Sequence, residues 1–279
     1  MQLRELISKT QSALAAAGCA DAAFDAAQLV AAAAKIEPNR LILCRNAAAD
    51  DAVCEKVQAM CKQRIDGRPL QYILGCWEFY GLPFLVGEGV LIPRADTEIL
   101  VEQALAMIKE TGAKKVIDLC SGSGCVGIAI AKHAPVQVRA IEKFAPAMDY
   151  TRRNIELNRL QTVRATAGDL FDGPGALQCE LLVSNPPYIP HDELPALQKE
   201  VLREPTTALD GGADGLDCYR AIAQKWVPCI NPGGGVLVEV GIHQADDVAA
   251  LFESAGLADI RKITDLCGIE RVVSARVPR

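Results

Sequence analysis

The tetrapeptide Asn185-Pro186-Pro187-Tyr188 has the residue types needed to hold a weakly nucleophilic nitrogen in a reactive orientation. Its prolines end the apolar segment 181–184 and fix an extended backbone, so that carbonyl groups point outward. The side-chain oxygen of Asn185 and the carbonyl of Pro186 can accept both N–H hydrogens of an amide or aniline nitrogen, and Tyr188 offers a flat face for stacking. This corner, residues 185–188, is expected to act by positioning and hydrogen-bond acceptance. A rigid turn without chemistry is the alternative interpretation.

A glycine-rich loop that begins at Asp118 predicts a second site, for a nucleotide-like cofactor. Gly122, Gly124 and Gly127 match the spacing of the dinucleotide fingerprint, so NAD stays open as an alternative, as does a plain tight turn. Asp118 lies at the end of the preceding strand, where it can anchor the loop or meet an ammonium group of the ligand. An acid beside the pyrophosphate of a dinucleotide has no such use. We therefore expect S-adenosyl-L-methionine.

Two further acids follow the next two strands and extend this predicted site. Glu142 suits the ribose hydroxyls of either ligand, whereas Asp169 can accept a hydrogen bond from an adenine amino group while Leu170 packs on the ring. Together with Asp118 they place negative charge around a cationic sulfonium. The predicted cofactor-binding residues are Asp118, Cys120, Ser121, Gly122, Ser123, Gly124, Glu142, Asp169, Leu170 and Asn185.

The hydrophobic pattern divides the chain into three parts. Residues 1–75 read as a small bundle of helices, since apolar residues recur there at spacings of three and four. Residues 76–95 read as a short strand pair that links the bundle to the rest. The remainder, 96–279, carries the chemical motifs, so we expect the bundle to serve in docking a protein substrate.

Strands and helices alternate from residue 114 onward, which is typical of an α/β fold with a mostly parallel, Rossmann-like sheet. We expect a closing antiparallel pair near the end of the chain. The predicted strands are 116–119, 136–141, 181–184, 235–240, 260–263 and 272–275. The predicted helices are 96–110, 124–133, 146–158, 219–230 and 244–255. In such a sheet ligands bind beyond the carboxyl ends of the strands.

Composition favours an ordinary globular protein of the cytoplasm. No apolar run approaches the roughly 20 residues that cross a bilayer, and the first ten residues do not resemble a signal peptide. The 11 cysteines are odd in number and scattered, without a paired spacing, so we expect neither disulfides nor a metal site. A net charge of −6 disfavours a nucleic-acid substrate.

Four stretches of the sequence together resemble one enzyme family. They are VLIPRADTE at 90–98, SNPPYI at 184–189, EPTTALDGGADGL at 204–216 and GRPLQYILG at 67–75. With the glycine-rich loop, they resemble the release factor glutamine methyltransferases over essentially the whole chain. The resemblance implies a class I methyltransferase domain. It also implies methylation of the glutamine in the Gly-Gly-Gln loop of peptide-chain release factors.

The resemblance also assigns roles to the residues of the corner. Asn185, Pro186 and Tyr188 are the expected catalytic residues, and Asn185, Pro186, Pro187 and Tyr188 the expected substrate-binding residues. The chain departs from the family where it has Cys120 instead of glycine, Glu142 instead of aspartate and Ala95 instead of proline. None of the three lies in the corner, so we expect them to affect cofactor affinity more than activity.

The segment that leads into the α/β part leaves two interpretations open. Arg94, Asp96 and Thr97 either cover the cofactor or form a helix cap with an ion pair to Glu98 or Glu102.

Three other functions are weighed against glutamine methylation. A methyltransferase acting on adenine or guanine in nucleic acid needs a basic groove, whereas the sequence shows no basic cluster larger than a pair such as Arg152-Arg153. A binding protein without activity has no use for the paired acceptors of the corner. An NAD-dependent oxidoreductase needs a positioned acid for hydride transfer, and none is evident.

Overall fold

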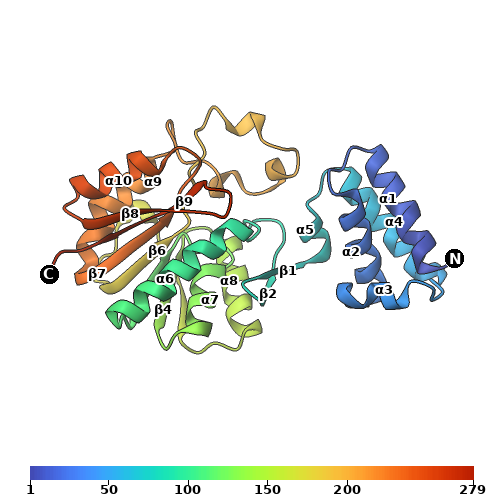
Figure 1. Cartoon of the computed structure of the whole chain (residues 1–279), viewed down its shortest axis with the longest axis horizontal. Helices are drawn as coiled ribbons and strands as arrows, with labels where there is room; N and C mark the ends of the chain where they lie inside the picture. Colours follow the sequence, from blue (N-terminus) through green and yellow to red (C-terminus); the bar gives the residue numbers. More distant parts are fainter. The chain divides into compact units, whose positions relative to one another are not determined.

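The computed structural model describes all 279 residues, which form two compact units. The first comprises Met1–Gly75 together with Gln198–Arg203, and the second comprises Cys76–Leu197 and Glu204–Arg279. The chain therefore leaves the second unit after Leu197 and returns to it at Glu204. Figure 1 follows the chain through both units.

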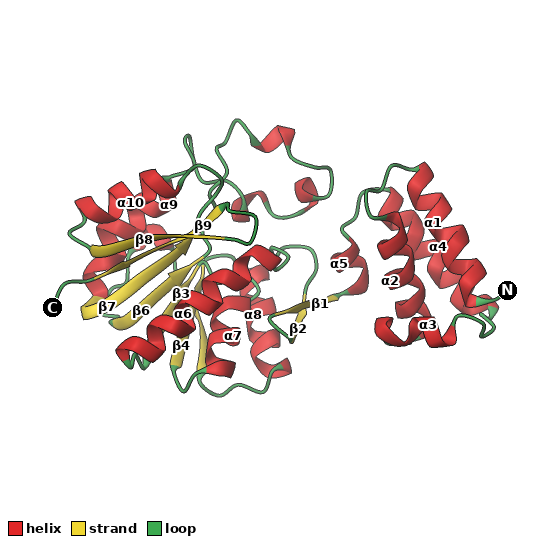
Figure 2. Cartoon of the chain, in the orientation of Figure 1, coloured by secondary structure: helices red, strands yellow, loops and turns green.

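The first unit is helical throughout (Figure 2). Buried Leu6, Leu14, Leu29 and Val57 form its apolar centre. The second helix ends where Lys35 adopts a left-handed conformation with φ 55°. The helices are α1 Leu3–Ala16, α2 Ala22–Ala34, α3 Leu41–Cys44, α4 Asp51–Ile65 and α5 Leu70–Leu74.

A buried arginine connects the parts of the first unit that are distant in sequence. Arg64 Nε lies 2.7 Å from Asp25 Oδ2, and Arg64 Nη2 lies 2.5 Å from Glu200 Oε1. The side chain of Lys199 packs so closely over Gly67 that an added Cβ would lie 2.6 Å from its Cε. These contacts bind the segment Gln198–Arg203 to the helical bundle.

The second unit begins with a hairpin of β1 Cys76–Phe79 and β2 Leu82–Leu85, followed by a seven-stranded sheet. The strand order is β5-β4-β3-β6-β7-β9-β8, with β3 to β7 parallel and the last two strands antiparallel. The predicted Rossmann-like sheet is thus confirmed. Its strands are β3 Lys115–Leu119, β4 Gln137–Glu142, β5 Val163–Ala167, β6 Cys179–Ser184, β7 Ile230–Glu239, β8 Ala258–Thr264 and β9 Glu270–Arg276.

Helices cover both faces of this sheet (Figure 1). Apolar residues of α6 Glu98–Thr111 and α7 Cys125–His133 share one core cluster with the sheet. Residues of α9 Asp217–Ala221 and α10 Ala245–Ser254 share the other. The helix α8 Ala145–Leu157 packs against β5. The layers explain why the strands are almost continuously apolar.

The helix predicted over 219–230 is not one continuous α-helix. It consists of α9, a π-helical turn at Ile222–Trp226 and a 3-10 turn at Val227–Cys229. Pro228 has no N–H to continue the helical hydrogen bonds, and the Trp226 side chain is fixed by a hydrogen bond from its Nε1 to the Leu170 carbonyl, 2.7 Å.

The strand order reverses around β3, which lies between β4 and β6. A crevice forms at the carboxyl ends of the strands at such a point, and it is the usual ligand site of open α/β sheets. The loop after β3 and the corner after β6 both emerge there.

Candidate active site

A cavity of about 420 Å³ opens at the carboxyl ends of β3, β4 and β6. Its size is that of a small-molecule site, for which roughly 300–1,000 Å³ is usual. Most of the predicted site residues line it, but Gly124, Pro186 and Tyr188 do not. The predicted residues that line the cavity are Asp118, Cys120, Ser121, Gly122, Ser123, Glu142, Asp169, Leu170, Asn185 and Pro187.

Asp118 anchors the glycine-rich loop to the helix that follows. Its buried carboxylate accepts a hydrogen bond from the Gly127 amide, Oδ2 to N 2.9 Å. A Cβ at Gly127 would lie 2.8 Å from the same oxygen, so only glycine permits α7 to pack this closely. Burial raises the pKa of Asp118 to about 7. Of the two roles that the sequence left open, anchoring the loop is the one seen.

Glu142 holds the same loop from the neighbouring strand. One carboxylate oxygen accepts from the Gly122 amide and the other from the Phe144 amide, each at 2.8 Å. Burial raises the pKa of Glu142. Both oxygens thus have backbone partners, and the expected contact with ribose hydroxyls stays a prediction.

Asp169 has a cationic partner that the sequence pattern did not reveal. Lys143 Nζ lies 2.7 Å from Asp169 Oδ2, while Oδ1 accepts from the Phe171 amide at 2.9 Å. Leu170, the residue after Asp169, is buried and lines the cavity. Asp169 therefore reaches the cavity as one half of an ion pair.

The corner after β6 presents Asn185 to the cavity. Asn185 Nδ2 donates to the Thr97 hydroxyl, Nδ2 to Oγ1 3.2 Å, which leaves the amide oxygen of Asn185 for another donor. The carbonyl of Tyr188 accepts from Gln244 Nε2 at 2.9 Å, so it is already occupied. Its ring packs at the edge of the core and does not line the cavity.

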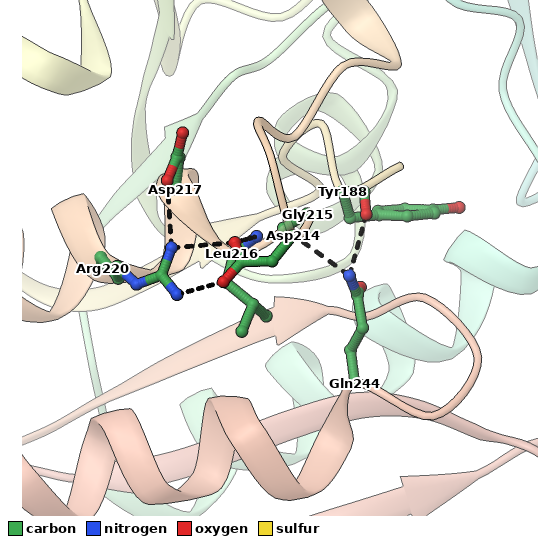
Figure 3. Close-up of polar contacts among 7 residues, drawn as sticks. All are labelled: Tyr188, Asp214, Gly215, Leu216, Asp217, Arg220 and Gln244. Atoms are coloured by element: carbon green, nitrogen blue, oxygen red, sulfur yellow. Dashed lines mark hydrogen bonds and ion pairs between the residues drawn. The ribbon is translucent and has the colours of Figure 1, made fainter. Parts of the chain in front are cut away.

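Gln244 connects the corner to the loop that precedes α9, as Figure 3 shows. Its amide nitrogen also lies 3.4 Å from the Gly215 carbonyl, and its oxygen accepts from the Gly241 amide at 2.9 Å. The loop is closed by Arg220, which pairs with Asp214 and Asp217 (Figure 3). The backbone around the corner is therefore fixed from the side of α10.

Known proteins match the chain over both units. The family description "PrmC N-terminal domain" matches residues 5–75, and "Methyltransferase small domain" matches residues 95–214. A release factor glutamine methyltransferase of Geobacter sulfurreducens is 39% identical over 277 residues, which cover 99% of this chain and 96% of the relative. One of Clostridium acetobutylicum is 42% identical, covering 74% of each chain. This chain belongs to the release factor glutamine methyltransferases.

A solved structure supports the fold of this family member independently of close sequence similarity. The methyltransferase from Pyrococcus furiosus superposes with a TM-score of 0.53 at 16% identity, covering 72% of this chain and 91% of that chain. The relatives confirm the predicted family, and this structure confirms the predicted methyltransferase fold.

At Cys120 the backbone explains why the family pattern has glycine. Its φ of 59° lies in the left-handed region, where glycine is free of strain and a residue with a Cβ is not. Burial raises the pKa of its thiol, as it raises that of Cys125 to about 12, so neither side chain forms a reactive thiolate.

Of the two interpretations of the segment before α6, the ion pair to Glu98 or Glu102 is wrong, whereas Arg94 and Thr97 line the cavity. Arg94 pairs with Glu204, whose other oxygen accepts from the Ile92 amide at 2.9 Å. Asp96 pairs with Arg271 Nη2 at 2.9 Å. Both partners lie far away in the sequence, where local spacing could not indicate them.

Sequence reasoning missed two lining segments, 89–93 and 205–218, although the family motifs run through both. The signal for the second was its Gly211-Gly212 pair. A Cβ at Gly211 would lie 2.7 Å from the backbone of Tyr188, so the loop can approach the corner only with glycine there.

None of the helices combines the length and apolar character that crossing a membrane requires.

Proposed function

We propose that this chain transfers the methyl group of S-adenosyl-L-methionine to the side-chain amide nitrogen of the glutamine in the Gly-Gly-Gln loop of a peptide-chain release factor. Membership of the family confirms the predicted enzyme class, cofactor and activity. The observation that carries the residue assignment is the orientation of Asn185. Its NH2 group is held by Thr97, so its oxygen is available to a substrate amide at the cavity.

The proposed chemistry requires the chain to orient a poor nucleophile. S-adenosyl-L-methionine, when bound, supplies an electrophilic methyl group on a sulfonium. Asn185 Oδ1 and the Pro186 carbonyl accept the two N–H hydrogens of the substrate amide and direct its lone pair at that methyl carbon. A nitrogen–carbon bond forms, the carbon–sulfur bond breaks and the nitrogen then loses a proton to solvent. Catalysis arises from preorganised acceptors rather than a strong base.

The cofactor is proposed to lie along the loop between β3 and α7. Asp118 and Glu142 hold that loop through the amides of Gly127 and Gly122. These carboxylates have no cationic partner among the ion pairs of the chain. Their field therefore favours a cationic sulfonium ligand. Stacking of the Tyr188 ring on the substrate amide stays a prediction, because the ring does not line the cavity.

The helical unit is proposed to dock the protein substrate, because it carries no chemical motif. Met1, Phe24, Ile42 and Leu43 expose much of their apolar surface in this unit. The enzyme's partner is thus a release factor, without direct contact to nucleic acid. Since release factors act in translation, the cytoplasm is the proposed location.

A substrate comparison tests the assignment. Labelled S-adenosyl-L-methionine is incubated with the enzyme and, separately, a release factor, the same factor with its loop glutamine replaced by alanine, tRNA, rRNA and duplex DNA. Label is expected only on the unaltered factor. Label on adenine or guanine would show that the enzyme is instead a nucleic-acid methyltransferase. Equal label on the altered factor would exclude the glutamine as the target.

A further inference from the structure

A buried carboxylate stands directly behind the proposed catalytic asparagine. In the parallel pairing of β6 and β7, the last paired residues are Ser184 and Val238. The next residue on each strand is therefore Asn185 and Glu239, side by side at the edge of the sheet. Side chains alternate along a strand, so both point to the face covered by α6, as Val183 does in its core cluster.

Glu239 is costly to bury, and no cation forms an ion pair with it. Its residue is 3% exposed, and its Oε2 has no hydrogen-bond partner. The nearby cation, Arg271, is shared by Asp96 and Asp265, at 2.9 and 3.1 Å. A buried carboxylate without a paired cation destabilises a fold, which points to a role in the site.

Thr97 links the two residues. It lies at the first position before α6, where a threonine side chain commonly accepts a hydrogen bond from the helix, yet its hydroxyl caps no amide. It accepts instead from Asn185 Nδ2 at 3.2 Å. The Thr97 hydroxyl and the Asn185 amide are also donors toward Glu239, and they oppose the rise in the pKa of Glu239 that burial causes.

Once ionised, the Glu239 carboxylate only accepts hydrogen bonds, and this fixes every donor in the group. Thr97 must direct its hydroxyl proton at Glu239, which leaves the hydroxyl oxygen to accept from Asn185. The NH2 of Asn185 is therefore turned toward Thr97 and Glu239, and its oxygen toward the cavity. Without Glu239 the amide could rotate by a half turn and present donors to a substrate that also offers donors.

We propose that Glu239 is a positioning residue which, through Thr97, holds the Asn185 amide with its oxygen toward the substrate nitrogen. This inference rests on the proposed role of Asn185. It deepens that role by explaining how the chain selects one of two amide orientations.

Paired substitutions at Thr97 test the proposal in the full-length enzyme. Thr97→Val keeps the shape and removes the hydroxyl, whereas Thr97→Ser keeps the hydroxyl. The kcat for release-factor methylation is expected to fall about 10- to 100-fold in Thr97→Val, as for a lost hydrogen bond to a charged network, and Thr97→Ser should retain most of it. The Kd for S-adenosylhomocysteine should change little in either. Thr111→Val, at the far end of α6, is the control and should leave kcat unchanged.

Glu239→Leu and Glu239→Gln complete the test. Glu239→Leu should lower kcat as Thr97→Val does, while Glu239→Gln, which keeps an acceptor oxygen, should recover most of the rate. In the double variant Thr97→Val/Glu239→Leu, the second change should add less than about threefold, because both residues act in one chain. Equal rates for Thr97→Val and Thr97→Ser, or fully multiplicative losses, would overturn the proposal. Near-normal methylation by Asn185→Ala would instead refute the role of Asn185 itself.

Discussion

Both units bury carboxylates, but the buried carboxylate of the first unit is paired with a cation, whereas some of those in the second unit are not. In the first unit Asp25 is buried against Arg64, which also pairs with Glu200. In the second unit Asp118 and Glu239 are buried without a cation in contact, and burial raises the pKa of each to about 7. The first arrangement serves packing alone. The second leaves the carboxylates to other partners: Asp118 holds the glycine-rich loop through the Gly127 amide, and Glu239 lies behind Asn185 at the edge of the sheet.

The largest expected effect concerns the charge pair of the first unit. Arg64→Ala leaves two carboxylates without their partner, and breaking a buried pair in this way typically costs about 3–5 kcal/mol. Hydrogen-exchange protection in α2 and α4 should fall accordingly, while the Kd for S-adenosylhomocysteine stays unchanged. Arg40→Ala, at an exposed position, is the control. Full protection in Arg64→Ala would show that the pair does not stabilise the unit.

The unpaired acids of the second unit should affect the cofactor instead. Glu142→Ala removes the acceptor for the Gly122 and Phe144 amides. Hydrogen bonds to charged groups are worth about 1.5–3 kcal/mol, so the affinity for S-adenosylhomocysteine should fall roughly 10- to 100-fold. Isothermal calorimetry measures this, with the exposed Glu156→Ala as control. A change below twofold would remove Glu142 from the cofactor site.

The dependence of stability on pH should report on two unpaired acids of the second unit. The pKa of Glu239 is raised in the fold from 4.5 to about 7, and that of Asp118 from 3.8 to about 7. Between about pH 4 and 7 the unfolded chain therefore releases protons that the fold retains. Stability then falls as pH rises, by up to about 1.4 kcal/mol per pH unit for each group, and levels above pH 7.

Glu239→Gln isolates one of these contributions. The free energy of unfolding, measured in urea from pH 4.5 to 8, should decline less in the variant than in the unaltered protein. The variant should thus be the more stable protein at pH 8. Parallel curves would mean that Glu239 titrates in the fold as it does in the unfolded chain.

The smallest expected effect concerns backbone strain. Cys120→Gly and Lys35→Gly both place glycine at a left-handed residue, with φ 59° and 55°. Each should raise stability by no more than about 1 kcal/mol, because the relief of a Cβ contact is partly offset by the entropy of glycine. Only Cys120→Gly should also tighten cofactor binding, by calorimetry, since only Cys120 lines the cavity. An equal effect of Lys35→Gly on that affinity would contradict the account.

Local patterns sufficed for most of the elements and for the loop chemistry of the site, although they defined no range for β5. The apolar segments predicted the strands of the sheet, and the spacing of Asp118 and Gly127 predicted the loop. Both signals lie within a short stretch of sequence. The break in the helix predicted over 219–230 was not predicted, since the π-helical turn begins at Ile222, six residues before Pro228.

The partners of the site residues could not be predicted. Thr97 and Glu239 lie 88 residues before and 54 residues after Asn185 in the sequence, and only the order of the strands brings them together. The same holds for Arg94 with Glu204 and for Asp96 with Arg271. Spacing predicts which residues share an element, but the pairing of distant elements decides which side chain orients which.

The central claim is that the Asn185 oxygen accepts a hydrogen bond from the substrate amide, and one rate measures this most directly. Single-turnover methylation of a release factor by Asn185→Ala, with S-adenosyl-L-methionine saturating, should be slower than that of the unaltered enzyme on the order of 10²–10³-fold, as when one preorganised hydrogen-bond partner is removed. The Kd for S-adenosylhomocysteine should change only modestly. A single-turnover rate within threefold of the unaltered enzyme would contradict the account.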